Sequence, residues 1–200
     1  MRDTTTGPTA DPRPRPGGRS ARVVAAVHAA TLELLAELGY ESLQLSDVAK
    51  RAEVNKTTVY RRWPTKAALI ADLLTSFTKS TVATPDTGSL QEDLEALLSD
   101  IVTALANRSV RAVLNGALAG ADDSNDVRAA QARFWAERFR RSGAIVERAI
   151  TRGELPPGTD PRALLEMAAS PVYFRALFTV DAVTPEYLAE TARRAIRAFA

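Results

Sequence analysis

Apolar side chains recur with the 3.6-residue period of an α-helix from Ser20 to the end of the chain, and this limits the fold more than any other feature. One such stripe, at positions i, i+3, i+4, i+7 and i+11, consists of Val27, Ala30, Thr31, Leu34 and Leu38. No stretch alternates apolar and polar residues between turn signals, as a half-buried β-strand would. The sequence therefore predicts an all-α protein.

Capping residues and helix breakers divide the periodic sequence into about nine expected helices. Gly39 follows the first helix, Pro64 stops the third, and Gly153 ends the seventh. The expected helices cover about 20–38, 46–52 and 56–63, a fourth capped by Thr65, a fifth behind the capping box 89–92, and then about 109–119, 127–152, 161–180 and 185–199. The break around 85–88 suggests a domain boundary between the fourth and fifth helices.

Three regions are expected. Residues 1–19 hold four prolines and three glycines, which predicts a disordered arm. Residues 20–84 would form one domain and residues 85–200 a second. The net charge of +2 is unevenly distributed, because residues 1–84 carry 12 basic and 8 acidic side chains whereas residues 85–200 carry 14 and 16. A polyanion would therefore bind the N-terminal half.

Composition excludes several classes of protein. The chain has no cysteine, so disulfides and Cys-ligated zinc sites are impossible, and its single histidine, His28, cannot supply a two-histidine metal site on one chain. No uncharged apolar run of 18 residues and no secretory signal is visible. We expect a cytoplasmic protein that does not bind a membrane, with no cofactor, metal site or catalytic residues.

Residues 45–66 fit a helix-turn-helix, with a tight turn at Glu53-Val54 and a capping Asn55. On the second helix Val59 and Trp63 share the inner side, while hydroxyl, phenol and guanidinium groups share the outer side. Such groups suit base edges and phosphates in a DNA major groove. The candidate DNA-binding residues are Arg22, Gln44, Ser46, Asn55, Lys56, Thr57, Thr58, Tyr60, Arg61 and Lys66. A pair of short helices with a solvated polar face is the alternative. For Arg13 and Arg15, a solvated tail is favoured over DNA contact.

Residues 27–74 resemble the N-terminal domain of the TetR (tetracycline-repressor-like) transcriptional regulators. The resemblance rests on four segments, Leu38-Gly39-Tyr40, Asp47-Val48-Ala49, Val54 to Tyr60, and Trp63-Pro64-Thr65-Lys66, with Leu69 closing the pattern. Two positions depart from it. Glu53 stands where the family usually has glycine in the turn, and Trp63 replaces the usual phenylalanine. The negative charge of Glu53 would weaken DNA binding slightly.

The rest of the chain resembles the family's regulatory domain mainly in its layout. The resemblance implies a homodimer formed by the last two helices, through Leu164, Leu165, Ala168, Val172, Ala176, Leu188, Thr191, Ala192, Ala195 and Ile196. Burial of these faces within one chain is the alternative.

The resemblance also implies a cavity for a largely apolar small-molecule effector, with candidates Leu97, Ile101, Leu105, Leu114, Leu118, Phe134, Trp135, Arg138, Phe139, Phe174 and Phe178. Aromatic core packing is the alternative for any single one of them. Arg138 or Arg175 could pair with an anionic group or form salt bridges with Glu137 or other carboxylates.

The expected function is a ligand-responsive regulator, most simply a repressor, which binds a palindromic operator of double-stranded DNA as a dimer and is released by its effector. Two alternatives remain at this point. One is an effector-independent regulator or an activator. The other is a helical enzyme or small-molecule-binding protein that does not bind DNA.

Overall fold

The computed structural model describes residues 18–78 and 84–200, which form nine α-helices and no strand. The helices are α1 (Arg19–Ser42), α2 (Leu45–Arg51), α3 (Lys56–Arg62), α4 (Lys66–Thr78), α5 (Leu90–Ala106), α6 (Arg108–Asp123), α7 (Asn125–Arg152), α8 (Pro161–Phe178) and α9 (Pro185–Phe199). The predicted all-α class and the order of the helices are confirmed. The predicted arm lies outside the described residues except at positions 18 and 19.

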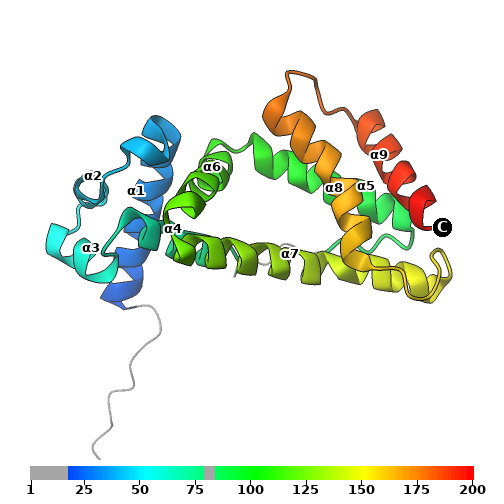
Figure 1. Ribbon diagram of the computed structural model, residues 1–200, viewed down its shortest axis with the longest axis horizontal. Coiled ribbons are helices and arrows are strands. Elements are labelled where there is room, and N and C mark those ends of the chain that lie inside the picture. The colour runs from blue at the N-terminus through cyan, green and yellow to red at the C-terminus, as the bar shows by residue number, and fades with distance from the viewer. Residues whose placement is uncertain (1–17, 79–83) are drawn as a thin grey trace, which may run out of the picture.

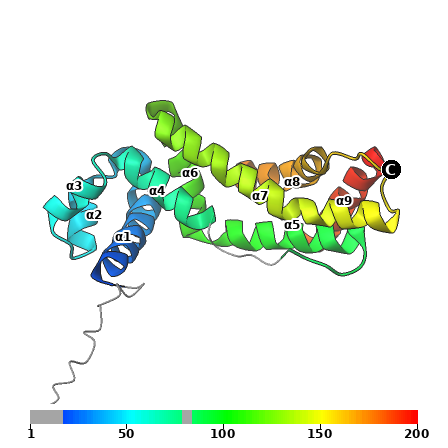
Figure 2. The ribbon, with the colours of Figure 1, turned by 90° about the horizontal axis from the view of Figure 1, so that it is seen from below.

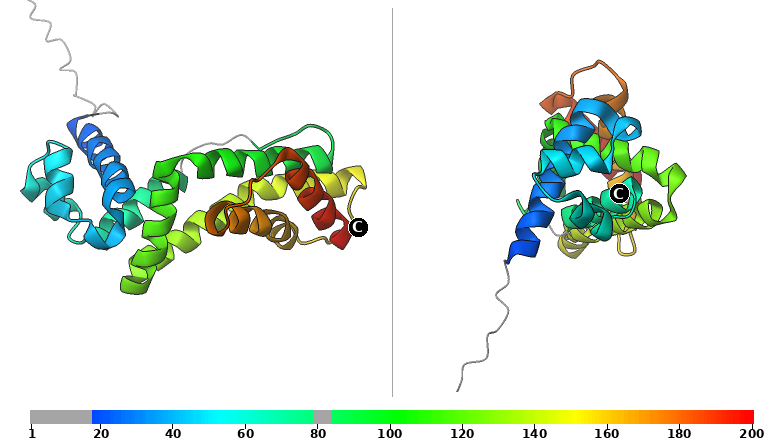
Figure 3. Two further views of the ribbon diagram at one scale, coloured as in Figure 1. Left: turned by 90° about the horizontal axis from the view of Figure 1, so that it is seen from above. Right: turned by 90° about the vertical axis from the view of Figure 1, so that its left-hand side faces the viewer.

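The molecule is elongated, with α2 and α3 at one end of its long axis and the C-terminus at the other (Figure 1). α6 crosses between the two parts, and α7 runs from beside α4 toward the far end, as the views from below and above also show (Figures 2 and 3). α8 and α9 pack on α5 in the C-terminal part. The two short helices α2 and α3 are therefore far from α8 and α9.

The core around α1 to α4 extends into the C-terminal part of the chain. Val113 and Ala117 of α6, and Val127 and Ala130 of α7, are buried in the same cluster as the apolar residues of α1 to α4. The hydrophobic core thus does not divide at residue 84, because α4 packs directly against α6 and α7. A second core joins α5, the C-terminal half of α7, α8 and α9.

α1 lies in the first core with the predicted face, except at the C-terminal end of that face. Val27, Ala30, Thr31 and Leu34 are buried. Leu38 is 48% exposed, whereas Leu35, outside the predicted stripe, is only 4% exposed. The helix breaks at Gly39, which has a φ of +76°, and the chain then directs the Tyr40 ring inward. Cβ atoms added at Gly116 and Gly120 of α6 would come within 3.2 Å of Leu35 and Tyr40, so these glycines allow α1 and α6 to approach closely.

By length and composition alone, α1 could also cross a membrane. Its apolar face nevertheless packs against α6 in the first core, and two of its carboxylates, Glu33 and Glu37, pair with Arg51 of α2 at 3.1 and 2.9 Å. These contacts are those of a core helix in a globular protein.

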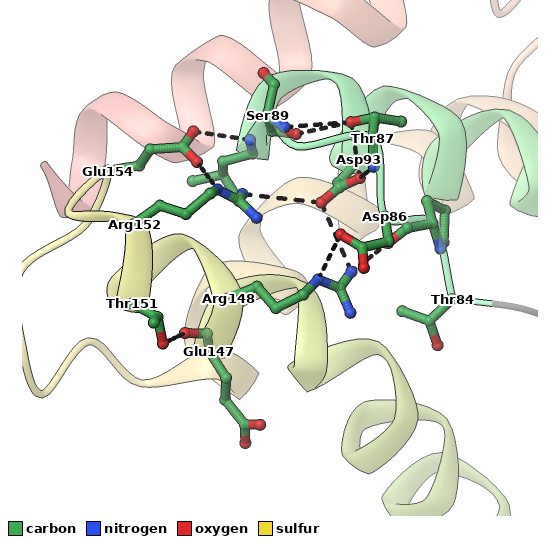
Figure 4. Close-up of polar contacts among 12 residues, drawn as sticks. Thr84, Asp86, Thr87, Ser89, Asp93, Glu147, Arg148, Thr151, Arg152 and Glu154 are labelled. Atoms are coloured by element: carbon green, nitrogen blue, oxygen red, sulfur yellow. Dashed lines mark hydrogen bonds and ion pairs between the residues drawn. The ribbon is translucent and has the colours of Figure 1, made fainter.

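A buried carboxylate fixes the beginning of α5 to the end of α7 (Figure 4). Asp93 is fully buried, and its Oδ1 accepts hydrogen bonds from the backbone N–H and the hydroxyl of Thr87 at 2.7 and 2.9 Å. The guanidinium groups of Arg148 and Arg152 lie 3.7 and 4.0 Å from its Oδ2. Glu154 accepts from the first backbone N–H of α5 at 2.8 Å. The connection that enters α5 is therefore anchored on α7.

Candidate functional site

α3 is a short helix with one buried and one exposed side. It begins at Asn55, whose Oδ1 accepts a hydrogen bond from the backbone N–H of Thr57 at 2.8 Å and so caps the helix. Val59 is fully buried and fixes the helix to the first core. The exposed side carries four of the predicted DNA-binding residues, Lys56, Thr57, Tyr60 and Arg61, and Thr58 is half-buried. The structure thus brings together on one exposed helix side the donors that the sequence singled out.

The turn before α3 has the strained backbone that its sequence indicated. Glu53 has a φ of +53° and is the one residue other than glycine with a positive φ among the described residues. The turn closes through a hydrogen bond from the Val54 N–H to the Ala49 carbonyl at 3.0 Å. Glu53 also lines an open hollow of about 810 Å³ together with Asn55, Thr58 and Arg61. Its negative charge therefore lies beside the exposed side of α3.

The end of α3 is held by a hydrogen-bonded group that the sequence did not predict. The indole Nε1–H of Trp63 donates to Oδ2 of Asp72 on α4 at 2.9 Å, and Nε2 of His28 on α1 lies 3.1 Å from the same oxygen. Phenylalanine, the usual residue at position 63 in the resemblance, has no N–H to donate. Asp72 therefore connects α1, the end of α3 and α4, and His28 has a structural partner.

Lys66 already has partners within the chain. Its ammonium group donates to the backbone carbonyls of Tyr40 and Glu41 at 3.1 and 3.2 Å and lies 4.3 Å from the centre of the Tyr40 ring. These contacts add a charged donor to two carbonyls at the C-terminal end of α1. Lys66 thus fastens α4 to the end of α1, and only part of its donor capacity remains for a phosphate.

The other candidate residues around α3 are accessible to different degrees. Arg22 is exposed in the first turn of α1, Gln44 is the exposed residue before α2, and Ser46 is half-buried in α2. Arg62 was not among the predicted residues; it is exposed, and its guanidinium lies 5.2 Å from the centre of the Trp63 ring.

The basic side chains near α3 also differ in their pairing. Arg51 is neutralised by Glu33 and Glu37, and its hydrogen bonds lower the pKa of Glu37. By contrast, Lys56 and Arg61 form no ion pair with any residue in the described ranges. The positive charge available to a polyanion is therefore concentrated on α3.

A second candidate site lies between α5, α7 and α8. A cavity of about 50 Å³ is lined by Leu97, Ile101, Trp135, Arg138, Phe139, Ser142, Leu165, Ala169 and Tyr173. Five of these were predicted, namely Leu97, Ile101, Trp135, Arg138 and Phe139. Ser142, Ala169 and Tyr173 were missed because their residue types do not stand out in an apolar helix. Leu165 was expected at a dimer interface instead.

The remaining predicted cavity residues do not lie together, which corrects the expectation of a single cavity. Leu114, Leu118 and Phe178 line an open groove of about 360 Å³ beside α1, and Leu105 is buried in the second core. Phe134 packs edge-on against Trp135, with 5.2 Å between the ring centres. Phe174 is 62% exposed. The helical period of the sequence alone could not show which of these residues share a cavity, because the helices are apolar on more than one side.

Both parts of the chain match models of one protein family. Residues 28–73 match "Bacterial regulatory proteins, tetR family", and residues 84–195 match "Tetracyclin repressor-like, C-terminal domain". The chain belongs to the TetR family. Members of this family are helix-turn-helix transcriptional regulators that bind operator DNA and are typically ligand-responsive repressors.

Individual transcriptional regulators are similar to this chain along most of its length. The regulator AqdR of Rhodococcus erythropolis is 34% identical over 147 residues, which cover 74% of this chain and 70% of AqdR. The regulator YdeS of Bacillus subtilis is 28% identical over 185 residues, 92% of this chain and 91% of YdeS. The crystal structure of the TetR-family regulator SCO0332 is 27% identical, has a TM-score of 0.67, and covers 90% of this chain and 99% of its own.

The residues predicted for a TetR-type dimer interface do not form a free surface. Eight of the ten are buried inside the chain: Leu164, Leu165, Ala168, Val172, Leu188, Thr191, Ala192 and Ala195. Ala176 and Ile196 are half-buried. The most apolar stripes of α8 and α9, which were predicted to pair with a second chain, instead pack on the core of the same chain. The outer face of α8 instead exposes Met167, Phe174 and Phe178, at 48, 62 and 73%.

Proposed function

We propose that this TetR-family protein is a cytoplasmic repressor that binds a palindromic operator as a homodimer and leaves it when a small-molecule effector binds. The observation that carries the proposal is the exposed side of α3, where Lys56, Thr57, Tyr60 and Arg61 present donors, and Lys56 and Arg61 form no ion pair within the described residues. The helix is fixed by Val59 and by the Trp63–Asp72 hydrogen bond, so its donors are positioned before DNA binds. Lys56 and Arg61 would contact phosphates, and the hydroxyl groups would reach base edges.

Binding to a palindrome requires two copies of α3 about 34–36 Å apart, or a multiple of that distance. The exposed apolar stripe of α8, formed by Met167, Phe174 and Phe178, supports pairing of two chains around a two-fold axis. Phe174 and Phe178 stack with 5.8 Å between their ring centres and offer a continuous aromatic surface. Dimerisation through this stripe places one α3 on each side of the axis.

Release would follow from the packing of α4. This helix contacts α6 and α7, and it carries Asp72, which holds the end of α3. An effector that displaces α7 therefore moves α4, and with it the spacing between the two copies of α3. A small change in spacing is sufficient, because both half-sites must dock at once.

Fluorescence anisotropy with a labelled duplex from the region upstream of the protein's own gene tests the proposal. Arg61→Ala should weaken binding by about 10-fold or more and lower the slope of log K against log salt by about 1, because one phosphate contact is lost. Arg133→Ala, an equally exposed arginine on α7, is the matched control and should bind like the wild type. Equal affinities for Arg61→Ala and the wild type at about 0.15 M salt would contradict the role of α3.

The dimer requires a separate measurement. Phe174→Asp places a charge within the exposed stripe and should convert the dimer to a monomer in light scattering, whereas Val180→Asp, at a fully exposed position after α8, should leave the mass unchanged. A dimer that persists in Phe174→Asp would show that another surface pairs the chains.

A further inference from the structure

The cavity between α5, α7 and α8 is lined in part by three residues whose polar groups have no protein partner. Within residues 18–78 and 84–200, neither the guanidinium of Arg138 nor the hydroxyl groups of Ser142 and Tyr173 form a hydrogen bond or ion pair. The other lining residues are apolar or aromatic. None of these polar atoms is completely buried without a hydrogen-bond partner, so each is open to solvent and available to an entering ligand.

Arg138 is free because its neighbours are paired with one another. Glu137 accepts hydrogen bonds from Arg140 at 2.8 Å and from Arg141 at 2.6 Å, and these lower the pKa of Glu137 to about 2. Arg175, the other candidate for an anionic group, lies 3.9 Å from the centre of the Tyr187 ring. Of the two arginines considered for the effector, Arg138 is therefore the one that brings positive charge to the cavity.

Tyr173 lines the same cavity as Arg138, and the Arg138 charge acts on its hydroxyl. Burial raises the pKa of Tyr173 against the opposing effect of the Arg138 charge, so its hydroxyl stays protonated at neutral pH and can donate a hydrogen bond. Arg138, Tyr173 and Ser142 are thus three donors with no acceptor. A carboxylate accepts several hydrogen bonds and pairs with a guanidinium through two of them, so it matches this set of donors.

The apolar wall of the cavity is aromatic. The Trp135 ring meets Tyr173 edge-on at 5.7 Å and lies 6.3 Å from Phe139. The Arg162 guanidinium lies 5.0 Å from the centre of the Phe139 ring and forms an ion pair with Glu166. Arg162 thus covers the Phe139 ring. Rings in such tilted and edge-on arrangements favour another flat ring between or against them.

The size of the cavity limits the ligand. Its volume is about 50 Å³, whereas an apolar cavity of about 150 Å³ is needed to admit benzene. Even a single ring would therefore have to separate α7 from α8. A drug-sized molecule would require a rearrangement several times larger.

We propose that this cavity binds a small planar aromatic carboxylate, whose carboxylate pairs with Arg138 and accepts from Tyr173 and Ser142, and whose ring packs against Trp135 and Phe139. The inference rests on the proposed function, since this ligand would be the effector. It replaces the largely apolar effector expected from the sequence by one with a single negative charge.

Isothermal titration calorimetry of the full chain without DNA tests the ligand class with three probes. Benzoate carries both the ring and the charge, benzamide has a similar shape without the charge, and cyclohexanecarboxylate has the charge without the flat ring. Benzoate should bind at least about 10-fold more tightly than either of the others, which corresponds to one charge-assisted hydrogen-bonded pair. Equal binding of benzoate and benzamide would overturn the role of the charge.

The variant Arg138→Gln should reduce benzoate binding to the level of benzamide and leave benzamide binding unchanged. Arg133→Gln, an exposed arginine of the same helix, is the matched control and should bind benzoate like the wild type. Benzoate binding that survives Arg138→Gln would overturn the proposal. So would the absence of benzoate binding by the wild type at benzoate concentrations up to about 10 mM.

Operator binding without any probe is measured in parallel for the wild type and Arg138→Gln. If both bind the operator but benzoate does not bind, the proposed ligand class fails and the regulator stands. If benzoate binds and the operator does not, the proposed function fails while the cavity assignment stands.

Discussion

Replacing Glu53 by glycine tests how the turn before α3 is adapted in this chain. The residue has a φ of +53°, a conformation that crowds its Cβ against the backbone at a cost of about 1–2 kcal/mol. Glycine removes this cost but loses about 0.5–1 kcal/mol more conformational entropy on folding. The net effect should be about 0.5–1 kcal/mol of added stability, which for a chain of this size raises Tm by about 1–4 °C.

Glu53→Gly should also bind DNA more tightly. Glu53 shares its hollow with Asn55 and Arg61, so its charge faces the same phosphates. At about 8 Å in water a pair of unit charges interacts by about 0.5 kcal/mol, which predicts an affinity gain of about 2-fold that declines as salt is added.

The matched control is Glu53→Gln, which removes the charge and keeps the Cβ. It should reproduce the gain in DNA affinity in fluorescence anisotropy, but not the rise of Tm in calorimetry. If Glu53→Gln raises Tm as much as Glu53→Gly, the charge and not the backbone conformation limits stability. A lower Tm for Glu53→Gly would refute the reasoning altogether.

Three further predictions concern contacts that hold the helices together. Asp72→Ala should lower the free energy of unfolding by about 2–3 kcal/mol in urea titrations, because it leaves the buried indole N–H of Trp63 unpaired, whereas Asp72→Asn keeps an acceptor and should cost less. Gly120→Ala should lower Tm, because its Cβ would come within 3.2 Å of the Tyr40 ring, where a cost of about 1–3 kcal/mol is typical of overpacking; an unchanged Tm would mean that the ring can move. Glu137 has its pKa lowered to about 2 by the two arginines that follow it on α7, so its stabilising effect should be present above its ordinary pKa of 4.5 and be lost as the pH falls toward 2. The difference in Tm between the wild type and Glu137→Gln should therefore shrink between pH 5 and pH 3, and a difference independent of pH would contradict this pairing.

The sequence predicted those features that depend on local chemistry. Asn55 and Ser89 cap the helices that they were expected to cap, because a cap needs only neighbouring residues. The exposed side of α3 was predicted for the same reason, since Val59 and Trp63 share the inner side of the helix and both are buried. The left-handed backbone at Glu53 was indicated by the resemblance, because the family usually has glycine at this position.

Features that depend on distant residues were not predictable. Nothing in the neighbourhood of Asp72 indicates that its carboxylate accepts from an indole nine residues earlier and meets His28 forty-four residues earlier. The buried Asp93 looked like an ordinary acidic residue in the first turn of a helix, where it also favours the helix dipole. The buried face of α8 was predicted to be the dimer interface, because an apolar stripe in the sequence does not indicate whether it packs on its own chain or on a partner chain.

The two cores explain how an effector could act at a distance. α7 contributes Val127 and Ala130 to the core around α4, and Ile145 and Val146 to the core under α8. From Ala130 to Arg138 the axial distance is about 12 Å along α7, which is unbroken between them. The core around α4 and the cavity are therefore connected by one stiff helix. The far end of α7 is held by the contacts to Asp93 described above. A ring that separates α7 from α8 therefore meets resistance at that end, and the displacement is directed to the beginning of α7, where α4 lies against it.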